Sequence, residues 1–423
     1  MAGFGKGRKI RRRRRRIFGK TRSHIWKKVG WVALGLFVVF SGFVVTKFLY
    51  ENVDFTPSSS DSSSSTTSPA TELTTGEPTN TTSPPGEIPV APNAALRAFH
   101  IQIGQLANSG TLSAAIDGAV AAGFNAVVFD LKSDDGVVWY ASSVPAATKA
   151  QSPSALSVER LEAAMSELRD AGLLPVARIF AFKDKLAPIN VPGGKITVTG
   201  QPSYTWLDNS KENGGKPWLN PYSQSAHNYI IDISVELSNL GFTAILLDGV
   251  QFPHQISSAD FGQSELRDTM SWPQVLTKLV GDVTGAVAPQ CRIIHAMPGL
   301  ASFGTNDANY SFGANPVTFG AATVAPVLFP SSLGRNLSAG DVTVADPAAQ
   351  PYDAVKLASD QIRQRVELIG DGRPRVMPWI DGGSTYSAAA IKDQLRAVSE
   401  VYGNDYSCIL YSVNGRYPFA ELK

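Results

Sequence analysis

Residues 241–253 are Gly-Phe-Thr-Ala-Ile-Leu-Leu-Asp-Gly-Val-Gln-Phe-Pro, an apolar run that ends on one carboxylate, Asp248, and breaks at Gly249. Five of the six residues from Phe242 to Leu247 are apolar, which predicts a strand buried on both faces. Such strands belong to parallel sheets covered by helices. A carboxylate is costly inside a dry strand unless it is paired. At the carboxyl end of a parallel strand it would face the side where barrel enzymes carry out their chemistry, so Asp248 is the first candidate functional residue.

The same alternation of short apolar runs and longer amphipathic stretches continues through residues 95–423. Glycines 123, 172 and 241 each close a predicted helix just before a predicted strand. This order predicts a parallel sheet with right-handed crossovers, and eight strands predict a (β/α)8 TIM barrel. A doubly wound open sheet is the alternative, but no Gly-x-Gly-x-x-Gly follows the first strand. The predicted strands are 96–103, 126–131, 174–180, 243–248, 292–297, 321–329, 376–380 and 408–413, and the predicted helices are 111–122, 157–171, 223–240, 271–287, 351–368 and 387–402. No helix is evident over 298–320, and the helix after the last strand is expected to be short or absent.

Three carboxylates, Asp130, Asp248 and Asp381, lie at the ends of predicted strands and would share one face of the barrel. Hydrolysis of a glycosidic bond needs two carboxyl groups, one as acid and one as nucleophile or base. The three are therefore the candidate catalytic residues, with Asp248 as nucleophile or base. For Asp130 the alternative is an ion-pair network with Lys132 or Arg178 that only closes the top of the barrel.

Aromatic, basic and amide side chains in or beside the same loops are candidates for sugar binding, because flat rings stack on sugar faces. Several have a structural alternative: Trp206, Trp218 and Asn220 would fold the long loop after the third strand, and His295 would be a hydrogen-bonded wall residue. No Cys/His spacing typical of zinc is present, and the two cysteines are expected to be buried thiols, so no metal or cofactor is expected. The candidates are Lys132, Arg178, Trp206, Trp218, Asn220, His295 and Trp379.

The amino-terminal part differs sharply in composition from the rest. Residues 1–47 contain fourteen Lys and Arg and no Asp or Glu, whereas the remainder carries 24 basic and 36 acidic residues. The pattern predicts a basic cytoplasmic tail at 1–28, a transmembrane signal-anchor at 29–50 and a disordered Ser/Thr/Pro-rich linker at 51–94, with the barrel outside the cytoplasm. A cleaved signal peptide is the alternative to the anchor. The arginine run at 11–16 would favour nucleic-acid binding only if the apolar span did not insert, so no nucleic-acid partner is expected.

Four motifs occur in a fixed order along the predicted barrel. They are Val-Phe-Asp-x-Lys-x-Asp-x-Gly at 128–136, Ala-Arg-Ile-x-x-Phe-Lys-Asp at 177–184, Trp-x-Asn-Pro-Tyr at 218–222 and Gly-Phe-x-x-Ile-x-x-Asp-x-x-x-Phe-Pro at 241–253. Together they resemble the bacterial "putative glycosyl hydrolase" domain, an α-amylase-like TIM barrel on membrane-anchored surface proteins. The resemblance implies that Asp248 occupies the nucleophile position of amylase-like enzymes.

The chain departs from that family at several positions around the expected site. Gly249 and Gln251 replace the usual Tyr and Arg after the fourth strand, and Asp381 replaces a Gln after the seventh. No carboxylate ends the fifth strand, where an amylase-like enzyme keeps its general acid, so Asp381 or Asp130 would have to supply that acid. The expected function is a glycoside hydrolase acting on cell-envelope or extracellular polysaccharide. The alternative is a catalytically inactive barrel that binds glycan or organises the envelope.

Overall fold

The computed structural model describes residues 94–303, 311–383 and 385–423. The expected basic tail and anchor, and all of the expected linker except its last residue, lie outside these ranges and stay predictions. Within the described ranges, none of the helices combines the length and the apolar character needed to cross a bilayer.

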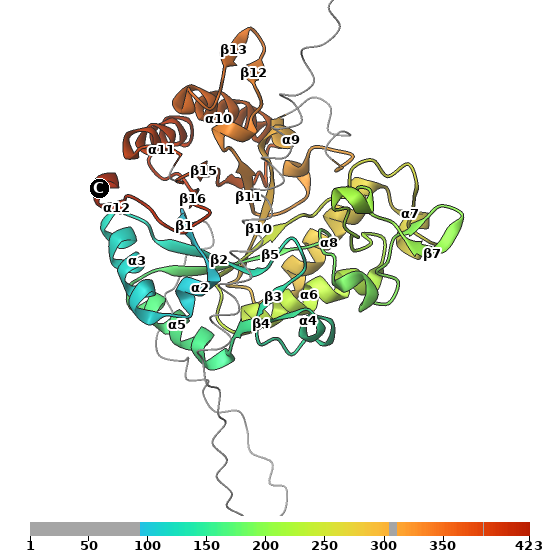
Figure 1. The fold of residues 1–423 in the computed structure, drawn as a ribbon. Coiled ribbons are helices and arrows are strands. Elements are labelled where there is room, and N and C mark those ends of the chain that lie inside the picture. The colour runs from blue at the N-terminus through green and yellow to red at the C-terminus, as the bar shows by residue number, and fades with distance from the viewer. Residues whose placement is uncertain (1–93, 304–310, 384) are drawn as a thin grey trace, which may run out of the picture. The chain divides into compact units, whose positions relative to one another are not determined.

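Parallel strands form a closed barrel at the centre of the described ranges (Figure 1). The ring closes because β1 pairs with β2 on one side and with β16 on the other, through Phe99↔Val127 and Phe99↔Leu410. Closure confirms the eight-stranded barrel and excludes the open sheet. The seventh strand is interrupted at Met377 and Pro378, so it appears as two short pieces. The barrel strands are β1 (Arg97–Ile101), β2 (Ala126–Lys132), β5 (Leu174–Phe180), β8 (Ala244–Asp248), β10 (Arg292–Pro298), β11 (Thr323–Val327), β14 (Arg375–Val376) with β15 (Trp379–Asp381), and β16 (Cys408–Tyr411).

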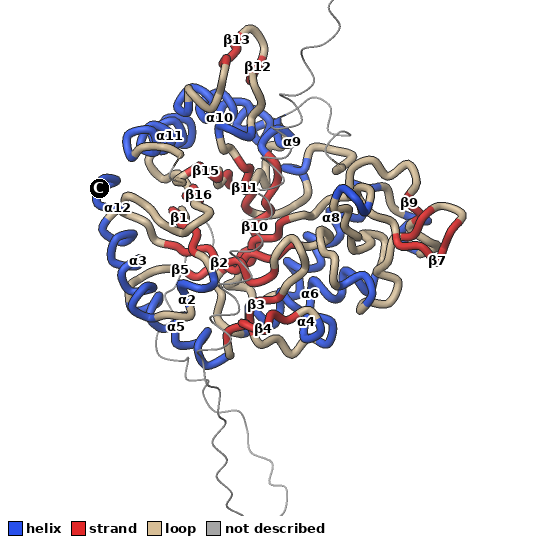
Figure 2. The backbone as a smooth tube through the Cα atoms, viewed as in Figure 1, coloured by secondary structure: helices blue, strands red, loops and turns tan. Residues whose placement is uncertain are grey.

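In the described part of the chain, six long helices lie outside the strands, and Figure 2 shows helices in blue around strands in red. The Ser157 hydroxyl accepts a hydrogen bond from the Arg160 amide and starts one of them, an ordinary N-cap. Gly172 has φ +74°, which suits glycine at a helix end and agrees with the sequence expectation. The helices are α3 (Ser109–Ala121), α5 (Val158–Asp170), α6 (Gln224–Asn239), α8 (Trp272–Ala286), α10 (Pro351–Glu367) and α11 (Ala388–Tyr402).

Two shorter helices complete the comparison with the sequence. α9 (Gly299–Phe303) begins directly after β10, where no helix was evident, because its five residues are too few to show a helical period. α12 (Phe419–Leu422) follows β16 and is the short last helix that was expected.

The barrel interior holds its own apolar core, distinct from the larger core between strands and helices. Inward positions alternate along each strand, as in Ala126 and Val128 on β2 or Ala244 and Leu246 on β8. The next inward position on each strand lies at its carboxyl end. This period of two therefore decides which side chains meet at the mouth of the barrel.

The connections between barrel elements carry additional small elements, most of them in the long loops after β2, β5, β8 and β11. Strands β6 and β9 pair, and with β7 they form a small sheet that joins the loop after β5 to the loop after β8. A β12–β13 hairpin projects after β11 (Figure 1). The additional elements are α2 (Ile103–Leu106), β3 (Val138–Tyr140), α4 (Pro145–Lys149), β4 (Gln151–Leu156), β6 (Thr197–Val198), β7 (Gln201–Thr205), β9 (Ala259–Asp260), α7 (Glu265–Thr269), β12 (Asn336–Ala339), β13 (Val342–Ala345) and short 3-10 turns at Ala187–Ile189, Lys211–Asn213, Pro316–Thr318 and Pro330–Ser332.

Candidate active site

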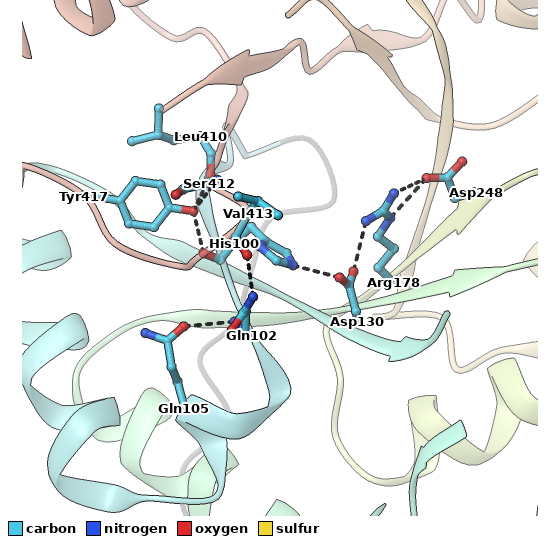
Figure 3. Close-up of polar contacts among 10 residues, drawn as sticks. All are labelled: His100, Gln102, Gln105, Asp130, Arg178, Asp248, Leu410, Ser412, Val413 and Tyr417. Carbon is cyan, nitrogen blue, oxygen red and sulfur yellow. Dashed lines mark hydrogen bonds and ion pairs between the residues drawn. The ribbon is translucent and has the colours of Figure 1, made fainter. Parts of the chain in front are cut away.

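A continuous chain of polar contacts crosses the carboxyl end of four neighbouring strands (Figure 3). Arg178 donates from Nε and Nη2 to Oδ2 of Asp248, at 3.0 and 2.6 Å. Its Nη1 donates to Oδ1 of Asp130 at 3.1 Å. Oδ2 of Asp130 lies 2.9 Å from Nε2 of His100. The four residues, one each from β1, β2, β5 and β8, make the polar chain of the site.

The strand alternation explains why these four side chains meet. His100 follows Ala98, Asp130 follows Val128, Arg178 follows Val176 and Asp248 follows Leu246, each two residues beyond an inward apolar side chain. The strands β1, β2, β5 and β8 are consecutive in the barrel, and Asp130 is in direct register with Arg178. Neighbouring strands thus bring these side chains together at one end of the barrel, and the polar chain lies above the apolar interior.

In the polar chain, burial and the neighbouring opposite charges act on each pKa in opposite directions. Burial acts to raise the pKa of Asp130, but the hydrogen bond and charge of His100, followed by those of Arg178, lower it to about 2. Burial acts to lower the pKa of Arg178, and the charges of Asp248 and Asp130 outweigh it and raise that pKa. The guanidinium carbon also lies 4.6 Å from the centre of the Phe180 ring and 4.7 Å from that of Trp379. Arg178 is thus a permanently charged bridge between two carboxylates.

Asp248 remains reachable from solvent despite its partners. Its side chain is 18% exposed, while those of Asp130 and Arg178 are 31% and 14% exposed. Oδ1 of Asp248 accepts a hydrogen bond from the Gly249 amide at 2.7 Å, so both oxygens are oriented. Gly249 has φ +62°, a conformation that glycine adopts without strain. The turn after β8 therefore holds the carboxylate in place at the barrel mouth.

Asp381 lies at the end of β15 but apart from the polar chain. Its Oδ1 accepts a hydrogen bond from the Gly383 amide at 2.8 Å, within its own loop. Burial raises its pKa, partly offset by that hydrogen bond, and no ion pair joins it to another described residue. The environments of Asp130 and Asp381 therefore move their pKa values in opposite directions, the usual basis for telling a base from an acid.

Lys132 does not join the site. A register shift between Asp130 and Lys132 aligns Lys132 with Ile179, which packs outside the barrel. Its buried Nζ lies 2.7 Å from Oδ2 of the equally buried Asp184 and donates to the Phe180 carbonyl at 2.5 Å. A side chain at Gly136 would collide with Asp184, because a Cβ there would lie 1.9 Å from Oδ1. Lys132 and Asp184 thus hold the loop after β5 against the strand β2.

The aromatic and amide candidates in the long loops are buried in the fold of those loops. Trp206 donates from Nε1 to the Ser258 hydroxyl at 3.2 Å, and Trp218 donates to Oδ2 of Asp208 at 2.9 Å. Asn220 donates to the Phe261 carbonyl at 2.8 Å. The three side chains thus make the contacts expected of residues that fold the long loop after the third barrel strand, β5.

His295 and Trp379 are both buried, but on opposite sides of the barrel wall. His295 alternates with the inward residues Ile294 and Ala296, whereas Trp379 belongs to the interior core. His295 is fully buried, stacks on Phe319 at 5.6 Å, and burial lowers its pKa to about 4. Trp379 is almost fully buried, with its ring beside Arg178. Of the residues expected to bind substrate, Arg178 is the one that the structure joins directly to Asp248 and Asp130.

Two kinds of site residue were missed by the sequence interpretation. His100 belongs to the polar chain, and the rings of Phe329 and Tyr411 lie at the same mouth. The missed signal is the period of two, because His100 follows inward Ala98 and Tyr411 follows inward Ile409. The two cysteines, Cys291 and Cys408, are buried free thiols as expected. In the part of the chain that the structure describes, no cluster of three His, Cys, Asp or Glu could hold a metal ion.

The sequence of residues 98–417 matches the family model described as "Putative glycosyl hydrolase domain". The chain belongs to this family. The match spans the whole barrel, from the second residue of β1 to Tyr417, and so confirms the resemblance inferred from the four motifs. No curated protein matches the chain.

Solved structures with a similar chain path include several proteins that act on carbohydrate. The catalytic domain of a beta-amylase from Paenibacillus polymyxa is 10% identical, with 78% of this chain and 95% of that chain covered and a TM-score of 0.48. An endo-beta-1,4-mannanase from Thermotoga petrophila is also 10% identical, with 76% of this chain and 68% of that chain covered and a TM-score of 0.44. A hypothetical protein from Ruminiclostridium thermocellum is 21% identical over 46% of this chain and 96% of that chain, with a TM-score of 0.40. Likeness at this level adds nothing to the functional argument.

Proposed function

We propose that this protein is a glycoside hydrolase of cell-envelope or extracellular polysaccharide, with Asp248 as nucleophile or base. The observation that carries the proposal is the Asp248–Arg178 pair, which lies at the catalytic end of a barrel of the glycosyl hydrolase family. A carboxylate that attacks a sugar carbon, or activates a water, must be held in a fixed orientation, and the Arg178 guanidinium and the Gly249 amide each hold one oxygen of Asp248.

The general acid is assigned to Asp381 in this proposal. An acid must hold its proton until the bond to the leaving oxygen breaks, which requires a raised pKa. The pKa of Asp130 is about 2, so this carboxyl would carry no proton at neutral pH. Burial raises the pKa of Asp381 instead, and this favours Asp381 over Asp130. Asp130 then serves to hold Arg178.

Comparing Asp248→Asn with the wild type on a panel of polysaccharides tests the proposal. Loss of a nucleophile or base from one member of a carboxylate pair should lower turnover by at least about 1,000-fold. Asp405→Asn is the matched control, since Asp405 lies at the opposite end of the barrel and pairs with Arg375 on the surface. Equal turnover by wild type and Asp248→Asn would refute the assignment.

A glycan-binding barrel without catalysis is the second candidate. It is favoured by the absence of a carboxylate at the end of β10, where Met297 and Pro298 stand, and by the engagement of Asp130 with Arg178. Retention of polysaccharide by wild type and Asp248→Asn alike, without release of reducing ends by either, would establish that function instead.

We further propose that residues 29–50 anchor the chain in a membrane, with 1–28 in the cytoplasm and the barrel outside it. The support is the uncharged apolar run at 29–46 and the cluster of basic residues that precedes it. Membrane fractionation of the full-length protein should recover it in the pellet after a high-salt wash. Protease added to intact cells or spheroplasts should then cleave the linker at 51–94 and release the barrel. Recovery in the soluble fraction would contradict the anchor.

A further inference from the structure

Two aromatic rings form a wall at the mouth of the barrel, which we call the aromatic wall. Phe329 follows β11 and Tyr411 ends β16, and their rings stack with centres 5.3 Å apart and planes inclined by 23°. Both side chains are only partly buried and rest on the interior core, with Trp379 5.6 Å from Tyr411 beneath them. Trp379 also lies 4.7 Å from the Arg178 guanidinium, so the two rings lie beside the polar chain.

The aromatic wall adjoins the polar chain directly. The His100 ring lies 4.7 Å from that of Tyr411, while His100 Nε2 lies against Asp130. The Asp130 and Arg178 side chains next to it are 31% and 14% exposed. Partly exposed aromatic rings beside exposed hydrogen-bonding groups are the combination that a sugar ring matches, since a pyranose has apolar C–H faces and a polar rim.

The segment after β16 is fixed beside the wall. The Tyr417 phenol accepts a hydrogen bond from the Ser412 amide at 3.0 Å and donates to the His100 carbonyl at 2.5 Å (Figure 3). Gln102 donates to the Val413 carbonyl from the other side. These contacts tie β1 and the end of β16 together, so Tyr411 is held before a ligand arrives, which reduces the entropy lost on binding.

Carboxylates outnumber Lys and Arg side chains around the aromatic wall. Burial raises the pKa of Tyr411. Among the charged groups nearby, Arg178 lowers this pKa, whereas Asp130, Asp134 and Asp248 raise it further. Asp134 is paired with Lys183 at 2.7 Å, and Arg178 is shared by two carboxylates. The one guanidinium of Arg178 thus serves two carboxylates, Asp130 and Asp248, and a third carboxylate brought beside them by a ligand would be repelled.

We propose that Phe329 and Tyr411 form a sugar-stacking subsite, and that the neighbouring carboxylates limit it to sugar residues without negative charge. The subsite would accept neutral and amino sugars and reject uronates. The inference rests on the proposed action on glycans and names the class of sugar recognised. It does not require that the bound glycan be cleaved.

A glycan array of neutral, amino-sugar and uronate-containing oligosaccharides, probed with the full-length protein, tests the charge preference. We expect binding to neutral or amino-sugar glycans and none to glycans built from uronates. Dissociation constants for the strongest array ligand, measured by isothermal titration calorimetry, then test the wall. Tyr411→Ala and Phe329→Ala should each weaken binding by about tenfold or more, whereas Tyr411→Phe, which keeps the ring, should stay within about threefold.

Tyr204→Ala is the matched control, because Tyr204 is an exposed tyrosine on β7. It should bind as the wild type does, and circular dichroism should show that all variants are folded. Binding confined to uronates, binding to no glycan, or unchanged affinity in both alanine variants would overturn the proposal. Reducing-end release from the same ligand separates the two proposals: binding without cleavage refutes the hydrolase alone, and cleavage unaffected by the alanine variants refutes the wall alone.

Discussion

Arg178 is the residue on which the geometry of the site depends. Three of its nitrogens contact two carboxylates, a pattern that a planar guanidinium can make and a single ammonium cannot. Either carboxylate without this partner would be a part-buried charge next to another of the same sign. The position of Asp248 is thus a consequence of a neighbouring strand as well as of its own.

Arg178→Lys should keep the charge but lose one of the two bridges. We expect a stability loss of about 1–3 kcal/mol in urea denaturation and a fall of at least about tenfold in turnover. Arg375→Lys is the matched control, because Arg375 pairs with the exposed Asp405 at the other end of the barrel. It should cost about 1 kcal/mol or less and leave turnover unchanged. Equal effects of the two substitutions would show that the bridge does not matter.

His295 should make the protein less stable in mild acid. Burial lowers its pKa in the folded state to about 4, below the ordinary 6.5, so the unfolded chain takes up a proton first as the pH falls. The stability that depends on neutral His295 is fully present above pH 6.5 and is lost as the pH falls from 6.5 to about 4. At pH 5 the unfolding free energy should be lower by about 2 kcal/mol than at neutral pH. His295→Leu should therefore flatten the dependence of unfolding free energy on pH between 7 and 5.

The slope should not vanish in that variant. Burial also lowers the pKa of His227 to about 4, so a comparable acid-sensitive group remains. The change in slope is the readout because any cost of repacking is the same at each pH. A slope identical to that of the wild type would contradict the buried neutral state of His295.

At the scale of elements, the attachment of the loop after β5 to the strand β2 depends on one buried ion pair. Lys132 and Asp184 have lost their contact with water, and Asp184 also accepts hydrogen bonds from the amides of Leu186 and Ala187 at 2.8 Å. Removing one partner from such a pair leaves the other charge buried without compensation. Without the Lys132–Asp184 pair, the loop after β5 and its small sheet should be less firmly attached to β2.

Lys132→Met should cost about 3–5 kcal/mol of unfolding free energy. Lys183→Met is the matched control, since Lys183 pairs with Asp134 in solvent, and it should cost about 1 kcal/mol or less. Urea denaturation of both variants gives the comparison, and limited proteolysis should cut residues 185–217 first in Lys132→Met. Similar losses in the two variants would show that the buried pair contributes no more than an exposed one.

At the scale of the whole molecule, stability depends on closing the barrel between its first and last strands. β1 and β16 are separated by most of the described chain, yet they pair through three residues, Arg97, Ala98 and Phe99. The Ile409 amide donates to the Pro378 carbonyl at 2.8 Å on the other side of β16. Without β16, two strand edges would be exposed to pairing with other chains.

Ile409→Pro should therefore disrupt the barrel, because proline removes this amide and cannot occupy the middle of a sheet. We expect a loss of at least about 3 kcal/mol, or insoluble protein. Ser338→Pro, in the projecting hairpin strand β12, is the control and should leave the barrel folded. Soluble yield and circular dichroism distinguish the outcomes, and native-like behaviour of Ile409→Pro would mean that closure is not required.

The sequence was sufficient to predict the barrel, most strand and helix positions, the family and the place of Asp248 at the end of β8, because these follow from local periodicity and ordered motifs. The hidden α9, the split seventh strand and the small sheet of the loops were not predictable, since their segments are too short to show a period. Whether a polar residue enters the site depends on where its strand places it. Lys132 and Asp130 are two residues apart, yet a register shift sends one to a buried pair outside the barrel and the other to Arg178. His100 joins the site because barrel closure brings β1 beside β2, where Asp130 lies. Side-chain charge and strand identity are local properties, whereas partnership between charges is set by strand register and closure, which only the folded barrel decides.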